Sequence, residues 1–134
     1  MWHTISYVSS SLKLSDFQIN DLMHCSKLKN EYAGINGILM HSGQNFFQII
    51  EGEKKIIQEL YSKIEKDSRH SNLIKIFDRQ IRVPSFKIFH NSYVTVHREK
   101  DYSELQQFLE KERSNNPDTF NSVSYLTNKF MQLP

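Results

Sequence analysis

Three polar residues stand where the pattern of the sequence predicts a buried core. Tyr7 and Gln48 alternate with apolar neighbours in predicted strands, and Asn30 ends the inward-facing stripe of a predicted helix. Taken singly, each is explained by hydrogen bonds to neighbouring protein groups, because buried polar groups must find partners. Together they favour a flat heteroaromatic ligand with carbonyl and ring-nitrogen acceptors, since the two amides offer both donors and acceptors.

The elements that must position these residues follow the order βαββαββ. Apolar residues alternate with polar ones in the strands, whereas they recur at three- and four-residue spacing in the helices. Ser15 predicts the start of the first helix, Gly34 predicts its end, and Pro84 separates the last two strands. The predicted strands span residues 3–9, 35–41, 45–52, 71–81 and 86–96, and the predicted helices span 15–33 and 53–67.

Both faces of the predicted sheet carry apolar residues. In the third strand, Phe46 and Ile50 share a face with Gln48, while Phe47 and Ile49 point to the opposite face. The sequence therefore predicts an α+β, ferredoxin-like fold with two helices on the face that holds Gln48.

The chain divides into a core over residues 1–97 and a polar extension over 98–134. Two further helices are predicted in the extension, at 101–113 and 117–132. We expect them on or near the opposite sheet face, or in contact with a partner.

Composition excludes several classes of protein. The 17 basic and 15 acidic residues leave a net charge of +2 without a basic patch, so nucleic acid is a poor candidate partner. Cys25 is the only cysteine, which excludes an internal disulfide and suits a reducing cytoplasm. No segment has the length and apolarity of a membrane span or a signal peptide. We expect a soluble cytoplasmic protein.

Four segments at characteristic spacing resemble the BLUF family of flavin-binding blue-light sensor domains. They are ISYVSS with Tyr7, KNEYAGINGIL with Asn30, FFQIIEG at positions 46–52 and KDSRHSN at positions 66–72. The resemblance covers roughly the first 95 residues, which is the whole predicted core.

The resemblance implies a bound flavin, either FAD or FMN, and a role for each candidate residue. Gln48 would form a hydrogen bond with Tyr7 and would lie against the N5 and O4 edge of the flavin. The ring would lie between Leu22 and Ile64. Other polar candidates would hold the ring edge or the phosphate: Lys29, Asn30, Lys63, Asp67, Arg69 and His70.

On the same resemblance, Tyr7 would give an electron and a proton to the photoexcited flavin. Gln48 would then rotate or tautomerise and strengthen its bond to the flavin carbonyl. No substrate turns over, so the protein would not be an enzyme. Because no effector domain follows the core, we expect output through a homo-oligomer or a separate effector protein.

The fifth predicted strand departs from the family pattern. Phe89 and Asn91 stand where tryptophan and methionine are usual, and Asn91 offers Gln48 a hydrogen-bonding neighbour in place of a thioether. We expect these changes to alter recovery rate and signal transmission without removing the photochemistry. The alternative is a ferredoxin-like interaction module that binds no flavin.

Enzyme and metal-binding classes have little support. The four glycines form no phosphate loop of the kind that a small phosphatase needs. The six histidines show no metal-ligand spacing.

Overall fold

The computed structural model describes residues 1–82, 93–96 and 110. The elements are β1 (Trp2–Ser10), α1 (Asp16–Tyr32), β2 (Asn36–Ser42), β3 (Asn45–Glu53), α2 (Lys54–Lys66), β4 (Ser71–Ile81) and β5 (Tyr93–Val96). This order confirms the predicted βαββαββ arrangement. The predictions for Phe89, Asn91 and the two helices of the extension lie outside the described residues.

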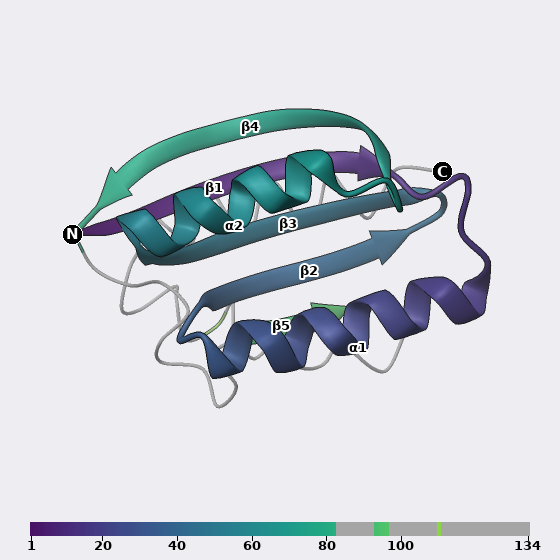
Figure 1. The fold of residues 1–134 in the computed structure, drawn as a ribbon, viewed down its shortest axis with the longest axis horizontal. Helices are drawn as coiled ribbons and strands as arrows, with labels where there is room; N and C mark the ends of the chain where they lie inside the picture. The colour runs from purple at the N-terminus through teal and green to yellow at the C-terminus, as the bar shows by residue number, and fades with distance from the viewer. Residues whose placement is uncertain (83–92, 97–109, 111–134) are drawn as a thin grey trace.

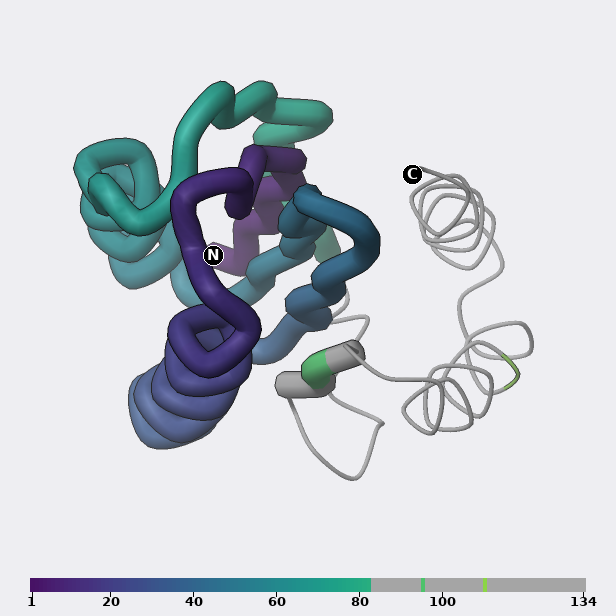
Figure 2. The backbone as a smooth tube through the Cα atoms, turned by 90° about the vertical axis from the view of Figure 1, so that its right-hand side faces the viewer, coloured from purple at the N-terminus to yellow at the C-terminus, as the bar shows by residue number. Residues whose placement is uncertain are grey.

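The strands form one sheet with the order β4-β1-β3-β2-β5. The first four strands pair antiparallel, and β5 adds to β2 in parallel. Helices α1 and α2 lie on the same face of the sheet, with α2 over β1 and β3 and α1 beside β2 and β5 (Figure 1). The perpendicular view shows the two helical coils on one side of the strands (Figure 2). The α+β, ferredoxin-like prediction is therefore confirmed.

Local sequence signals fix the ends of α1. Ser15 caps its start, and Gln18 returns the bond to the Ser15 backbone in a capping box. After Ala33, Gly34 adopts a φ of 73°, which a residue without a Cβ does at little cost. The Ile35 N–H then donates to the Asn30 carbonyl at 2.9 Å, which fixes the turn that carries Asn30.

The core fills the space between the sheet and the two helices. Its buried residues come from every element that meets there: Ile5, Tyr7, Ile19, Met23, Ile35, Leu39, Phe46, Ile50, Ile57 and Tyr61. Phe47 and Ile49, on the opposite face of β3, are also buried, at 1% and 2% exposed. Apolar residues are therefore buried on both faces of β3, as the alternation in the third strand predicts.

Strand β4 forms one edge of the described sheet and pairs irregularly with β1. The register shifts between Ser6 and Tyr7, and again between Val8 and Ser10. Asn72 adopts a φ of 53° close to the second shift. The ladder between β1 and β4 is thus interrupted on both sides of the segment that begins with Tyr7.

Candidate functional site

A cavity of about 380 Å³ lies between the two helices and the sheet. A volume of this size falls within the range of small-molecule and cofactor sites. Ten of the twelve sequence-predicted site residues line it: Tyr7, Leu22, Lys29, Asn30, Gln48, Lys63, Ile64, Asp67, Arg69 and His70. The other two, Phe89 and Asn91, are outside the described part of the chain.

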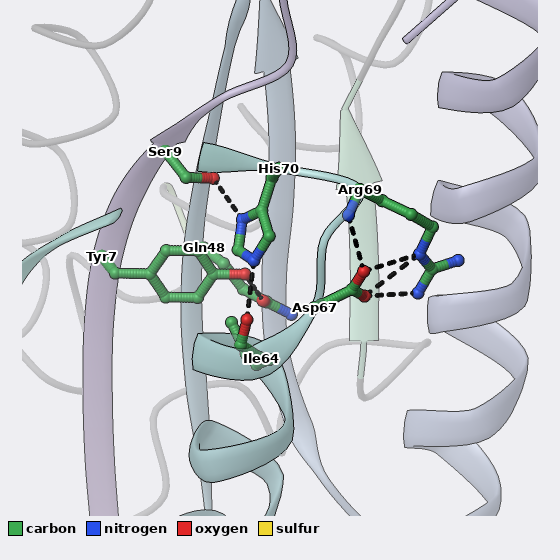
Figure 3. A network of polar contacts seen from close by, with 7 residues as sticks. All are labelled: Tyr7, Ser9, Gln48, Ile64, Asp67, Arg69 and His70. Carbon is green, nitrogen blue, oxygen red and sulfur yellow. Dashed lines mark hydrogen bonds and ion pairs between the residues drawn. The ribbon is translucent and has the colours of Figure 1, made fainter. Parts of the chain in front are cut away.

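Tyr7 and Gln48 meet on the sheet side of the cavity. They are direct partners in the β1–β3 ladder, which places their side chains next to each other on the helix-covered face. The Tyr7 hydroxyl donates a hydrogen bond to Gln48 Oε1, and both residues are buried (Figure 3). The wall of the cavity therefore contains a phenol and a carboxamide that are hydrogen-bonded to each other.

Apolar side chains from both helices line much of the cavity, beyond the predicted Leu22 and Ile64. On α2, Ile56 and Leu60 precede Ile64 at four-residue intervals and so share its helix face. The helical spacing of apolar residues is the signal that identifies Ile56 and Leu60, which the sequence analysis did not assign to the site.

The sheet, the two helices and the turn after α1 supply further lining residues that the sequence analysis missed. Leu39 lies opposite Gln48 in the β2–β3 ladder, and Phe46 shares the face of Gln48, so strand parity is the signal that identifies both. The remaining lining residues are Cys25, Ser26, Ala33, Ile35 and Glu59. Of these, Cys25 and Ser26 lie on the α1 face that also carries Leu22 and Asn30.

Asp67 and Arg69 form an ion pair just after α2. Arg69 Nη2 donates to Asp67 Oδ2 at 2.6 Å, and Arg69 Nε donates to Oδ1 and Oδ2 at 3.0 and 3.1 Å. The Arg69 backbone N–H adds a bond of 2.9 Å to Oδ1. Hydrogen bonds from the Arg69 side chain are the main reason why the pKa of the Asp67 carboxyl is below its ordinary value. The backbone N–H and the positive charge of Arg69 lower this pKa further, while burial opposes them. Asp67 thus orients the guanidinium beside the cavity.

His70 lies between the phenol of Tyr7 and the end of α2. Its Nδ1 contacts Ser9 Oγ at 2.7 Å, and its Nε2 contacts the Ile64 carbonyl oxygen at 2.7 Å. The ring also faces Tyr7 edge-on, with 6.1 Å between the ring centroids.

The sequence over residues 2–92 matches the family model described as BLUF, sensors of blue-light using FAD. That match spans more than half of the chain. The chain belongs to the BLUF family. BLUF domains are flavin-binding blue-light sensors, so the chain carries such a sensor domain, in which the domain itself senses light and does not catalyse a reaction.

Two curated relatives place the BLUF domain within larger proteins. The chain is 34% identical over 73 residues to the photoactivated adenylate cyclase subunit alpha of Euglena gracilis, which is 52% of this chain and 7% of the cyclase. It is 29% identical over 59 residues to the blue light- and temperature-regulated antirepressor BluF of Escherichia coli, which is 44% of this chain and 15% of that protein. The chain therefore spans a small part of these relatives.

Solved structures share the BLUF fold. Klebsiella pneumoniae BlrP1 with FMN and cyclic diGMP superposes with a TM-score of 0.73 at 26% identity, over 92% of this chain and 34% of BlrP1. The photo-activated state of BlsA superposes with a TM-score of 0.69 at 24% identity, over 100% of this chain and 97% of BlsA. The second likeness supports the fold alone.

Within the described residues, no helix combines the length and apolar character required to cross a membrane. Over the same residues, no group of three histidine, cysteine, aspartate or glutamate side chains is arranged to hold a metal ion.

Proposed function

We propose that the cavity between α1 and α2 holds the ring of FAD or FMN, and that Tyr7 and Gln48 form its light-responsive contact. The hydrogen bond from the Tyr7 hydroxyl to Gln48 Oε1, in the wall of the cavity, is the observation that carries this proposal. When bound, the flavin supplies the absorption of blue light and an excited state that is a strong oxidant.

The donor set and the walls of the cavity fit such a group. Leu22 on α1 and Ile64 on α2 offer apolar surface from the two helices, as a flat ring requires. Asn30 and Gln48 are buried, at 6% and 3% exposed, and each carries one donor end and one acceptor end for ring carbonyl and nitrogen atoms. The cavity therefore combines apolar walls with a few buried polar contacts.

Cationic side chains in the lining of the cavity would hold the phosphate. Lys29, Lys63 and Arg69 line the cavity, and all three are exposed enough to follow a ligand that leaves it. Asp67 engages Nε and Nη2 of Arg69, which leaves the Nη1 donors for an anion. The flavin ring and first phosphate are common to FAD and FMN, so these contacts serve either cofactor.

The response to light would be a reversal of the Gln48 carboxamide. In the described state Oε1 accepts from the Tyr7 hydroxyl. Reversal brings the Nε2 donor to the Tyr7 oxygen, which must then accept a hydrogen bond instead of donating one. Oε1 and Nε2 exchange positions, so every neighbour of the carboxamide meets a donor in place of an acceptor or the converse.

The output would pass to another protein rather than to a substrate. Phe17, Leu28 and Tyr32 on the outer side of α1 are 80%, 55% and 96% exposed, and apolar side chains of this kind favour partner contacts. We place the protein in the cytoplasm, as a non-enzymatic receptor that acts through a second copy of itself or through an effector protein.

Flavin binding combined with a light-minus-dark absorption spectrum tests this function. The purified protein is expected to be yellow, to bind FAD or FMN, and to show a red-shifted spectrum after blue light. Gln48→Ala is expected to abolish the red shift, whereas Gln44→Ala, in the exposed turn between β2 and β3, is expected to preserve it. A colourless protein that binds neither flavin would overturn the proposal and leave a flavin-free interaction module.

A further inference from the structure

His70 joins three elements that surround Tyr7. It stands directly before β4, and its ring reaches Ser9 of β1 through Nδ1 and the Ile64 carbonyl of α2 through Nε2, both at 2.7 Å (Figure 3). Ser9 is two residues beyond Tyr7 on the same strand, so the two side chains share one face of the sheet. A single imidazole therefore ties β1 to the end of α2 beside Tyr7.

The partners of the ring determine where its proton lies. A carbonyl oxygen can only accept a hydrogen bond, so Nε2 of His70 must carry the proton that it donates to Ile64. In the neutral ring, Nδ1 is then the acceptor and the Ser9 hydroxyl is the donor. Both nitrogens are engaged by the protein, and neither is available to a flavin while these bonds persist.

The same ring limits the positions that Tyr7 can adopt. His70 and Tyr61 each meet Tyr7 edge-on, with centroid separations of 6.1 and 6.0 Å. The backbone ladder between β1 and β4 shifts register between Val8 and Ser10, so it supports this part of β1 poorly. The bond between His70 and Ser9 therefore holds β1 to the start of β4 where the ladder is interrupted.

We infer that His70 is a positioning residue for Tyr7, held in the Nε2-protonated form by Ser9 and Ile64, rather than a ligand of the flavin. The inference rests on the proposed function only in its consequence for light sensing. Tyr7 and Gln48 must recover their original hydrogen bond in the dark, and the clamp made by Ser9, His70 and Ile64 keeps the Tyr7 ring where that bond can form. Ser9 and His70 thereby set the lifetime of the light-adapted state.

Nitrogen NMR of the histidine side chains tests the clamp without any cofactor. In the flavin-free protein, the His70 ring is expected to show a protonated Nε2 and an unprotonated Nδ1, assigned by the signals that disappear in His70→Gln. A proton on Nδ1 of the neutral ring, or a mixture of the two tautomers, would overturn the inference. The outcome does not depend on light sensing, so it separates failure of the clamp from failure of the proposed function.

Recovery kinetics of the flavin-loaded protein test the consequence. Ser9→Ala is expected to change the rate of dark recovery by about three- to tenfold, as loss of one neutral hydrogen bond allows, and to keep flavin affinity within about twofold. His70→Gln, which retains one donor and one acceptor, is expected to recover at a rate closer to the wild type than His70→Ala.

Ser6→Ala is the matched control for Ser9→Ala. Ser6 is also a buried serine of β1, at 0% exposed, but its hydroxyl has no hydrogen-bond partner among the residues that the structure describes. It is expected to recover at the wild-type rate. Equal recovery rates in Ser9→Ala and Ser6→Ala would overturn the clamp. A tenfold loss of flavin affinity in His70→Gln with unchanged recovery would instead indicate that His70 is a flavin ligand.

Discussion

The Tyr7 hydroxyl donates to Gln48 Oε1 because the two residues are direct partners in the β1–β3 ladder. That bond gives the carboxamide a direction, with its acceptor end toward the phenol. A carboxamide is nearly symmetric in shape but opposite in hydrogen-bonding character at its two ends. A half-turn therefore costs little in packing and inverts the pattern that neighbouring groups meet, which is what a two-state sensor requires.

Replacing Tyr7 by phenylalanine is expected to abolish the light-induced red shift while the protein still binds flavin. The substitution removes the hydroxyl that orients Gln48 and that supplies the transferable proton. Loss of one buried hydrogen bond is expected to lower the free energy of unfolding by about 1–2 kcal/mol. Light-minus-dark absorption and thermal melts measure the two effects.

Tyr61→Phe is the matched control for Tyr7→Phe. The ring centroids of Tyr61 and Tyr7 are 6.0 Å apart, so the two side chains are neighbours. The surroundings of Tyr61 are its own: burial raises the pKa of its phenol, and Lys75 Nζ lies 4.8 Å from its ring centroid. It does not line the cavity, so the red shift is expected to persist without its hydroxyl. A red shift retained in Tyr7→Phe and lost in Tyr61→Phe would exchange the roles of the two tyrosines.

Asn30→Ala is expected to weaken flavin binding about tenfold, because the buried amide at the end of α1 supplies hydrogen bonds that alanine cannot make. Asn20→Ala, on an exposed position of the same helix, is the control and is expected to bind as the wild type does. Fluorescence titration with FMN measures both affinities. Equal affinities in the two variants would remove Asn30 from the binding site.

The Asp67–Arg69 pair predicts a dependence of stability on pH. Hydrogen bonds from Arg69 lower the pKa of Asp67 from its ordinary value of 3.8, so the pair stabilises the fold fully above that value. The stabilisation is lost as the pH falls through the lowered pKa of the folded state. The Arg69 side chain is 53% exposed, so solvent screens the pair and its effect is small.

Asp67→Asn is accordingly expected to lower the melting temperature by roughly 2 °C at neutral pH. In acid, below the lowered pKa of Asp67, the variant and the wild type are expected to melt together, because the wild-type carboxyl is then protonated. Melts across the acidic range measure the difference. A difference that grows as the pH falls would contradict the pair as a source of stability.

Gly37 in β2 cannot accept a side chain. A Cβ at this position would lie 2.1 Å from the backbone oxygen of Ile49 on β3, and the backbone has a φ of 155°. Gly37→Ala is therefore expected to destabilise the protein by about 4 kcal/mol or more, since neither strand can move without breaking the ladder. Thermal or urea unfolding measures the loss.

Gly34→Ala separates backbone conformation from steric clash. Gly34 has a φ of 73°, but a Cβ there would meet no atom within 4 Å. Its cost is expected to be only about 1–2 kcal/mol, from the left-handed conformation alone. Equal destabilisation by the two substitutions would show that the contact with Ile49 is not the cause.

The order of elements and the residues of the sheet wall could be predicted from the sequence. Alternation places Tyr7 and Gln48 on one face, and the spacing of the α1 stripe brings Asn30 to the same side. The same parity identifies Phe46, which the sequence analysis placed on the face of Gln48 but did not assign to the site. The prediction fell short there because it weighed polar residues above apolar ones.

The partners of His70 could not be predicted from pattern. They depend on how the end of α2 approaches β1, which brings together Ser9 and His70 from positions 61 residues apart. Local sequence specifies a histidine after the helix and leaves open whether its ring points to a ligand, to solvent or to protein. Only the three-dimensional arrangement shows both nitrogens engaged.

Infrared difference spectroscopy tests the reversal of Gln48 most directly. The flavin-loaded protein, with ¹³C in its glutamine side-chain carbonyls, is compared before and after blue light, and Gln48→Ala identifies the bands of this residue. A glutamine carbonyl band that shifts with light and is missing from Gln48→Ala is the predicted result. A red-shifted absorption spectrum without any light-dependent band from Gln48 would contradict the account.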